Sequence, residues 1–262
     1  MSTLANARDV LLLIARLQRD VTVTDVTTEL NLPKSSVSRT LSMMAEYGFL
    51  ERDVMTRAYR PGNVVMEASW QFRAAHSTSS LLEESLAGLV RQSGYTGYIN
   101  VLDNADALVI HMRTGSRSLQ VYTPPGSRAP AWSSAAGRAL MAGLKSSELL
   151  AILPDHFDDA RGHAPRSLSE LSARIEEIKS NGWSLSRGEY ISDTAGISAA
   201  VVDPATGQGY GFGLAIPRDE LNDSLVAQLG MAVRDAASQV GKRVGDPFWL
   251  AFKTGNCKGL IV

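Results

Sequence analysis

A short helix, a break and a second helix near the N-terminus constrain the fold most strongly. Thr24 suits the N-cap of a helix that runs through Leu30. The break at Asn31-Leu32-Pro33 ends it, and the proline suits the first turn of the next helix, where a missing N–H costs nothing. Gly48 follows the last apolar residue of that helix and suits its C-terminal cap. The segment Thr24–Tyr47 is therefore predicted to form a helix-turn-helix.

The second helix of this pair has two faces of different chemistry. Val37, Leu41 and Met44 recur at i, i+4 and i+7 and should pack inward. A different stripe carries short polar side chains and one guanidinium, at Ser35, Ser38, Arg39 and Ser42. Short polar side chains let a helix approach base edges in the major groove, and arginine can donate two hydrogen bonds to guanine. The pattern favours DNA recognition, although helix-turn-helix geometry also occurs in proteins that do not bind DNA.

The residues after Gly48 predict a hairpin. Two strand-like runs, Phe49–Arg52 and Arg57–Arg60, flank a turn at 53–56. Their arginines are well placed to touch a DNA backbone beside the second helix. Local charge agrees with this, because residues 33–60 hold five basic and three acidic side chains while the whole chain has a net charge of −1. A plain three-helix cap with solvated charges is the alternative.

Beyond a connecting helix over Asn63–His76, the pattern predicts a second domain. Strands are expected near residues 95–102, 108–113, 118–122, 183–190, 197–202 and 210–216. Helices are expected near residues 82–94, 133–144, 147–153, 167–181 and 219–240. Strands grouped with separate helices predict an α+β fold with a largely antiparallel sheet.

The composition excludes several classes of protein. Hydrophobic residues make up 44% of the 262, enough for globular cores, and 20% of charged residues does not predict disorder. The single cysteine, Cys257, cannot form an internal disulfide. The apolar run Val10–Ala15 is too short to span a membrane. We expect a cytoplasmic protein with no membrane partner.

Two parts of the chain resemble the IclR family of bacterial regulators. The first runs over Val23–Leu41, with Leu-Pro-Lys-Ser-Ser-Val-Ser-Arg at its centre, and continues through Glu46–Arg52. The second includes Ser134–Ala142, Gly182-Trp183 and Ala199–Val202. The resemblance covers nearly the whole chain. It implies a winged-helix domain, a linker helix and a GAF-like effector domain.

The resemblance also implies domain boundaries and a function. The DNA-binding domain is expected at 1–62, the linker helix at 63–78, the effector domain at 79–245 and a tail at 246–262. We predict a ligand-responsive repressor of catabolic genes that binds double-stranded operator DNA as a homodimer or homotetramer. The predicted DNA-binding residues are Thr24, Lys34, Ser35, Ser36, Ser38, Arg39, Arg52, Arg57 and Tyr59.

The start of the helix expected near Ser133 is the predicted ligand site. Free backbone N–H groups there attract anions and Trp132 offers an apolar wall, so we expect a small organic acid or an aromatic metabolite. A serine that only caps the helix, with the tryptophan in the core, is the alternative. The predicted effector-binding residues are Trp132, Ser133, Ser134, Ala135, Ser186, Arg187, Glu189, Gly196, Ser198 and Gly213.

The chain departs from the family at several positions around this site. Asp193 stands where the family often has glycine, and Val201 stands where proline is frequent. Gly211 and Gly213 belong to an alternation that either floors a pocket or accepts a packed helix. These departures concern the identity of the effector and leave the expected fold unchanged.

No motif for catalysis or cofactor binding stands out. G-x-S-x-G and a Walker loop are absent, and Gly207–Gly213 does not have the spacing of a dinucleotide fingerprint. His156 and His163 flank aspartates without the ligand spacing of a metal site, and Cys257 lacks a local activating partner. We predict no catalytic residue, metal or cofactor. An enzyme with an interaction-only winged helix and a protein-binding adaptor are the alternatives.

Overall fold

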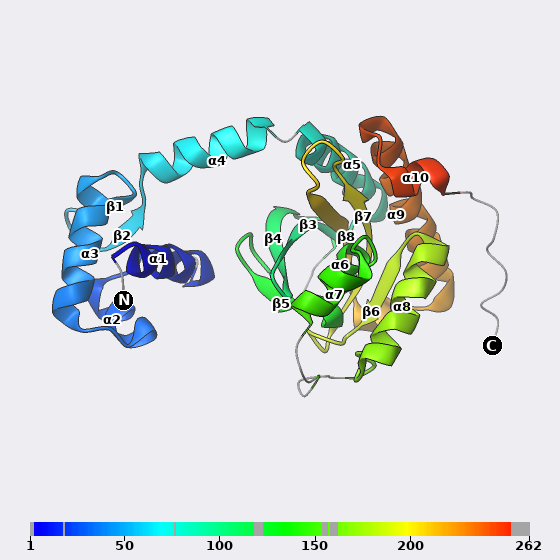
Figure 1. Ribbon diagram of the computed structural model, residues 1–262, viewed down its shortest axis with the longest axis horizontal. Helices are drawn as coiled ribbons and strands as arrows, with labels where there is room; N and C mark the ends of the chain where they lie inside the picture. Colours follow the sequence, from blue (N-terminus) through cyan, green and yellow to red (C-terminus); the bar gives the residue numbers. More distant parts are fainter. Residues whose placement is uncertain are drawn as a thin grey trace. The chain divides into compact units, whose positions relative to one another are not determined.

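The computed structural model describes residues 3–17, 19–75, 77–117, 123–153, 157 and 162–252. Its contacts divide the chain into two compact units, Met1–Ser77 (unit 1) and Thr78–Val262 (unit 2). Figure 1 labels the helices and strands of both. Across the described ranges, no helix is long and apolar enough to cross a membrane.

Unit 1 is a winged helix-turn-helix followed by a further helix. Its elements are α1 (Thr3–Leu17), α2 (Val23–Leu30), α3 (Lys34–Glu46), β1 (Leu50–Arg52), β2 (Tyr59–Pro61) and α4 (Asn63–Ala75). Val37, Leu41 and Met44 of α3 are buried, as their spacing predicts, and belong to one core cluster with Val10 of α1 and Val26 of α2. β1 and β2 pair antiparallel and form the wing.

The starts of the two helices correct two details of the prediction. Thr22, not Thr24, is the N-cap of α2, and Thr24 lies exposed in the first turn. Oγ1 of Thr22 accepts a hydrogen bond from the backbone N–H of Asp25, and the Asp25 carboxylate accepts one from the backbone N–H of Thr22. This capping box satisfies two donors, which a cap at Thr24 would not do. Pro33 is the cap residue just before α3 rather than part of its first turn.

Replacing Asp25 by asparagine should destabilise unit 1 at neutral pH by about 0.5–1 kcal/mol. Hydrogen bonds from Arg19 and Thr22 hold the pKa of Asp25 well below its usual range. A depressed folded pKa stabilises the fold above the unfolded pKa, near 4, and this contribution is lost as the pH falls through the folded value. Denaturant unfolding at pH 7 and pH 3 should therefore show a smaller difference between wild type and variant at pH 3.

Asp9→Asn is the matched control for this experiment. Asp9 is on the surface of α1, and its ion pair with Arg8 joins adjacent residues rather than capping a helix. We expect its effect to be within about 0.5 kcal/mol at both pH values. An equal loss of stability for Asp25→Asn at pH 7 and pH 3 would show that the charge of Asp25 does not contribute.

Unit 2 is built on one six-stranded antiparallel sheet in the order β5-β4-β3-β8-β7-β6. The strands are β3 (Thr96–Asp103), β4 (Asp106–Arg113), β5 (Arg128–Pro130), β6 (Ser184–Arg187), β7 (Thr194–Val202) and β8 (Gly209–Pro217). The helices are α5 (Ser77–Ser93), α6 (Ala135–Met141), α7 (Ser146–Ile152), α8 (Leu168–Asn181), α9 (Asp223–Val244) and α10 (Pro247–Ala251), with short 3-10 turns at Ala131–Ser133 and Arg218–Glu220. The prediction of an α+β fold with an antiparallel sheet is confirmed.

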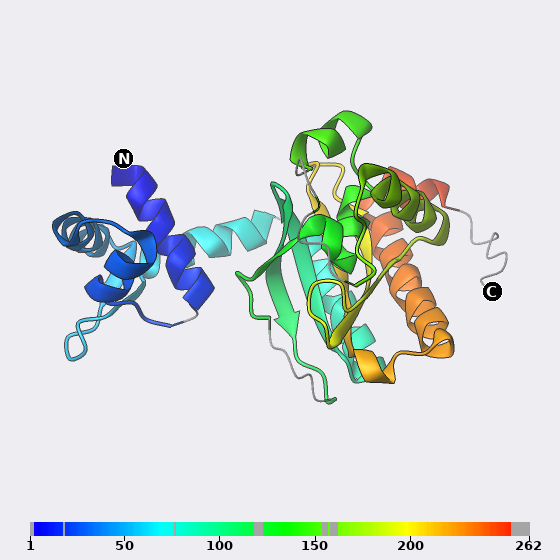
Figure 2. The same ribbon diagram turned by 90° about the horizontal axis from the view of Figure 1, so that it is seen from below.

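The two faces of the sheet are covered by different helices. The apolar residues of β7 and β8 join side chains of α5 and α9 in the main core of the unit. Gly97 of β3 leaves room on this face for Leu86 and Val90 of α5. The opposite face receives α6 (Figure 2). Gly211 of β8 lies against Leu140 of that helix. A pocket lies beside α6 on this second face.

Two short elements were not predicted, and several predictions fall outside the described residues. β5 spans only three residues and α10 only five. Trp249 of α10 is a core residue of unit 2, so the start of the apolar tail packs within its own unit. The strand predicted over 118–122, His156 with its neighbouring aspartates, and Cys257 lie outside the described ranges.

Candidate DNA interface and ligand pocket

The face of α3 that points away from the core carries the side chains predicted to read DNA. Lys34, Ser35, Ser38 and Arg39 are exposed, and Ser36 is half-buried. The buried side chains of α3 lie on the other face and pack in the core of unit 1, which fixes the orientation of the exposed stripe. Neither Lys34 nor Arg39 forms an ion pair within the described part of the chain. Both cations are therefore available to phosphates or base edges.

The wing presents two more exposed cations, Arg52 at the end of β1 and Arg57 after a hydrogen-bonded turn. One carboxylate oxygen of Asp53 accepts hydrogen bonds from the backbone N–H groups of Met55 and Thr56 at 2.9 and 2.7 Å. Hydrogen bonds from the backbone and the side chain of Thr56, with the one from Met55, hold the pKa of Asp53 below its usual range. Arg57 follows in the left-handed region, with φ of 58°, and is exposed, as is Arg52.

Tyr59 is the one predicted DNA contact that the structure contradicts. Its side chain is only 2% exposed and belongs to the core of unit 1. Its backbone N–H and carbonyl both pair with Val21. The guanidinium of Arg52 lies 5.5 Å from the centre of its ring, so Tyr59 supports a wing arginine rather than offering a surface of its own.

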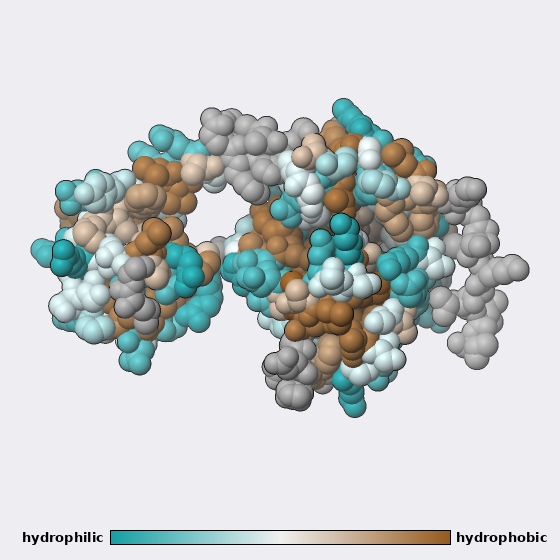
Figure 3. Space-filling view, viewed as in Figure 1, coloured by the Kyte–Doolittle hydropathy of each residue, from teal (hydrophilic) through white to brown (hydrophobic). Residues whose placement is uncertain are grey.

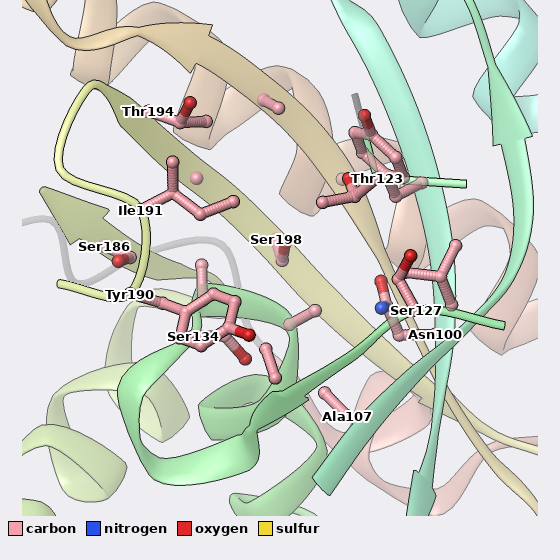
Figure 4. A pocket seen from close by; sticks show the side chains of 18 of the residues that line it. Asn100, Ala107, Thr123, Ser127, Ser134, Ser186, Tyr190, Ile191, Thr194 and Ser198 are labelled. Atoms are coloured by element: carbon pink, nitrogen blue, oxygen red, sulfur yellow. The ribbon is translucent and has the colours of Figure 1, made fainter. Parts of the chain in front are cut away.

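A pocket of about 140 Å³ lies on the second face of the unit 2 sheet, beside the start of α6. Figure 4 shows side chains from the sheet strands, from the start of α6 and from the loop after β6 gathered around it. Six of the ten predicted effector-binding residues line it: Ser134, Ala135, Ser186, Gly196, Ser198 and Gly213. Gly213 thus floors the pocket, whereas Gly211 accepts the packed helix.

The other four predicted residues do not line the pocket. Trp132 is buried in a separate core cluster and meets Phe157 edge to face, with ring centres 5.2 Å apart. The hydroxyl of Ser133 donates to the carbonyl of Pro130. Arg187 lies 3.5 Å from Asp223, and Glu189 is buried against Arg138. Trp132 is therefore a core residue, as the alternative interpretation had it, and Glu189 has a structural partner in Arg138.

Several lining residues were missed, although the sequence carries a signal for them. In β7, Thr194 was missed although it shares its face with the predicted Gly196 and Ser198, and all three alternate with residues of the apolar core. In β3, Tyr98 and Asn100 alternate with core residues in the same way. Successive strand residues point to opposite faces, so small and polar residues that alternate with core residues mark the face of the sheet opposite the main core, where a cavity can form. Further lining residues include Thr123, Ser127, Tyr190 and Ile191.

The pocket offers hydrogen bonds more than charge. Arg128 is the one cation among the described lining residues, and it pairs with Asp103 at 2.5 Å. The hydroxyl of Tyr98 is buried and has no hydrogen-bond partner in the described part of the chain. Buried polar groups are nearly always paired, so this hydroxyl fits a partner supplied by a bound molecule. The described residues contain no group of three His, Cys, Asp or Glu able to hold a metal ion.

A winged helix with an exposed cationic face, joined to a domain with a ligand-sized pocket, defines a class of protein: a DNA-binding regulator with a sensor domain. Two family models match the chain. The IclR helix-turn-helix domain matches residues 3–54, and the bacterial transcriptional regulator IclR C-terminal domain matches residues 75–242. The second match alone covers more than half of the chain. The chain therefore belongs to the IclR family of bacterial transcriptional regulators, as its sequence resemblance predicted.

Individual relatives agree with this assignment along nearly their whole length. The regulator KipR of Bacillus subtilis strain 168 is 24% identical, over 86% of this chain and 90% of its own. The repressor IclR of Escherichia coli K12 is 23% identical, over 87% and 84%. An IclR regulator of Alicyclobacillus acidocaldarius has the same fold, with a TM-score of 0.79 at 17% identity, covering 92% of this chain and 97% of its own. An IclR homologue of Microbacterium hydrocarbonoxydans, solved with 4-hydroxybenzoate, also has a TM-score of 0.79, at 16% identity. The match covers 93% of this chain and 99% of the homologue.

Proposed function

We propose that this regulator represses transcription by binding operator DNA through α3 and the wing, and that a small molecule in the unit 2 pocket changes this binding. The observation that carries the proposal is the exposed stripe of α3, where short hydroxyl side chains surround the exposed cation Arg39. Such a stripe can enter the major groove, while Arg52 and Arg57 reach the flanking phosphates.

The first test is a titration of the purified protein against DNA from beside its own gene. It is run at two salt concentrations with a scrambled competitor. Each phosphate contact releases counterions, so affinity should fall steeply with salt. Binding that saturates, depends on salt and outcompetes the scramble supports the proposal. A protein-binding adaptor would show no such binding at low salt, with or without candidate metabolites.

Arg39→Ala should lower operator affinity roughly 5-fold to 150-fold and relax sequence specificity, because a bidentate base contact is lost. Arg174→Ala, which removes an exposed arginine from α8 in unit 2, is the matched control and should change affinity less than about twofold. Fluorescence anisotropy with the operator and with single-base variants measures both effects. Unchanged affinity and specificity for the Arg39 variant would remove this residue from the recognition set.

We infer that the effector is a small organic acid or a single aromatic ring. A cavity of roughly 150 Å³ holds benzene, and the pocket here is about 140 Å³. Its hydroxyl groups suit oxygen atoms on such a ring, and the bound 4-hydroxybenzoate of the Microbacterium relative belongs to the same chemical class. A metabolite library that includes 4-hydroxybenzoate, titrated against the protein–operator complex, tests this. Release only by larger or purely apolar compounds would contradict it.

The same proposal includes the assembly and the setting of the protein. We propose a homodimer or homotetramer in the cytoplasm, which presents paired winged helices to an operator beside catabolic genes. The support is the family, whose named relatives are transcriptional regulators rather than enzymes. Half-site spacing then fixes the distance between recognition helices, and a ligand that changes this distance changes operator affinity. Turnover of any library compound would favour the enzyme alternative.

A further inference from the structure

A buried ion pair lies directly behind the wall of the pocket. Arg138 of α6 is 1% exposed and Glu189, just after β6, is 5% exposed. Nη1 of Arg138 lies 2.6 Å from Oε2 of Glu189. That oxygen makes no aligned hydrogen bond in the described chain, so the charge of Arg138 is its main compensation. Neither side chain lines the pocket.

The guanidinium of Arg138 also fixes two backbone segments. It donates to the carbonyl of Trp132 at 2.9 Å and to the carbonyl of Leu185 at 2.6 Å. Trp132 precedes the start of α6, where Ser134 lines the pocket, and Leu185 precedes Ser186, which lines it as well. One buried cation thus connects two parts of the pocket wall and, through Glu189, a third.

That third part is residues 188–193, the strap that joins β6 to β7. Its turn is tight: Gly188 has φ of 82°, and a Cβ there would lie 2.5 Å from the carbonyl oxygen of Ser192. Tyr190 and Ile191 of the strap line the pocket (Figure 4). The hydroxyl of Tyr190 donates to the carbonyl of Arg128 at 3.1 Å, which ties the strap to β5. The strap is therefore held at its base by Glu189 and further along by Tyr190.

Stability alone does not account for this pair. Taking two charges out of water is so costly that apolar side chains of similar volume are often equally stabilising. An apolar pair, however, has no preferred direction and makes no hydrogen bonds to backbone carbonyls. What the ion pair adds is a fixed placement of the segments it joins.

We propose that Arg138 and Glu189 are a positioning pair, which sets the conformation of the strap and through it the shape of the pocket. They act through Tyr190 and Ile191 and do not touch the bound molecule. The link to effector binding rests on the proposed function, but the placement of the strap does not. The pair is therefore testable on the free protein, without DNA or ligand.

Hydrogen exchange of peptides covering 184–194 tests the proposal in two variants. Glu189→Gln keeps the shape and removes the charge, and should raise exchange in these peptides about tenfold or more, while the central strands β7 and β8 stay protected. Arg138→Met with Glu189→Leu removes both charges and also the hydrogen bonds to the carbonyls of Trp132 and Leu185. It should therefore recover part of the free energy of unfolding that Glu189→Gln loses, but not the protection of the strap. Glu176→Gln, in the exposed pair with Lys179, is the control and should leave exchange unchanged.

The double variant separates positioning from simple stabilisation. If it recovers strap protection together with stability, or if Glu189→Gln leaves strap exchange at the wild-type level, the proposal is wrong. Should the single variant unfold, the double variant still decides between the two roles. A failed DNA titration would overturn the proposed function and leave this result untouched, so the two failures are distinguishable.

Discussion

Trp249→Ala is expected to lower the free energy of unfolding of unit 2 by about 3–5 kcal/mol, the usual cost of truncating a buried tryptophan. The side chain is 1% exposed, and its indole N–H donates to the carbonyl of Ala200 at 2.8 Å. It packs so closely on α9 that a Cβ at Gly241 would lie 2.2 Å from its ring. Removing it leaves a cavity between α10, α9 and β7 and an unpaired carbonyl.

Leu250→Ala, the next residue of the same short helix, is the matched control. Leu250 is 61% exposed, so its truncation should change stability by no more than about 0.5 kcal/mol. Denaturant unfolding followed by circular dichroism measures both variants, because tryptophan fluorescence changes with the mutation itself. If the Trp249 variant unfolds at the wild-type midpoint, α10 is a peripheral helix and not part of the core of unit 2.

The contribution of Trp249 illustrates which parts of the fold a sequence can predict. A long periodic segment such as Val37 to Met44 of α3 predicts both a helix and its buried face, because an apolar residue recurs on each turn. The helix that carries Trp249 and the strand Arg128–Pro130 are too short to show a period. The cap of α2 was misplaced by two residues, since Thr22 and Thr24 are both good capping residues. Only the capping box distinguishes them, because the Asp25 carboxylate accepts a hydrogen bond from the backbone N–H of Thr22.

The pocket shows the same limit at the level of single residues. Ser186 lines it and Arg187 does not, just as Ser134 lines it and Ser133 does not. Side chains of neighbouring residues in a strand or at a helix start point in different directions. The sequence pattern predicted which segments lie at the pocket, but not which side chains of those segments face it. The role of Glu189 depended on Arg138, which lies 51 positions earlier in the chain. A contact across that separation leaves no local pattern to detect.

Leu41→Ala is expected to unfold unit 1 in a large fraction of molecules and so abolish operator binding. Leu41 is fully buried at the centre of α3, and truncation of such a leucine costs about 2–5 kcal/mol. A unit of this size buries a smaller share of its surface than a larger domain does, so it has little stability to lose. The unfolding of unit 2, which we propose to be a separate transition, should keep its wild-type midpoint.

Leu4→Ala makes the same chemical change at an exposed position of α1, where the side chain is 80% exposed. It should leave both stability and operator affinity close to wild type. Calorimetry of the two variants then tests how the units are coupled. If Leu41→Ala shifts both transitions together, the units unfold as one cooperative body, and a signal can pass between them through stability alone. If only the first transition moves, the two units unfold independently, which favours an effector that acts on the placement of two folded units.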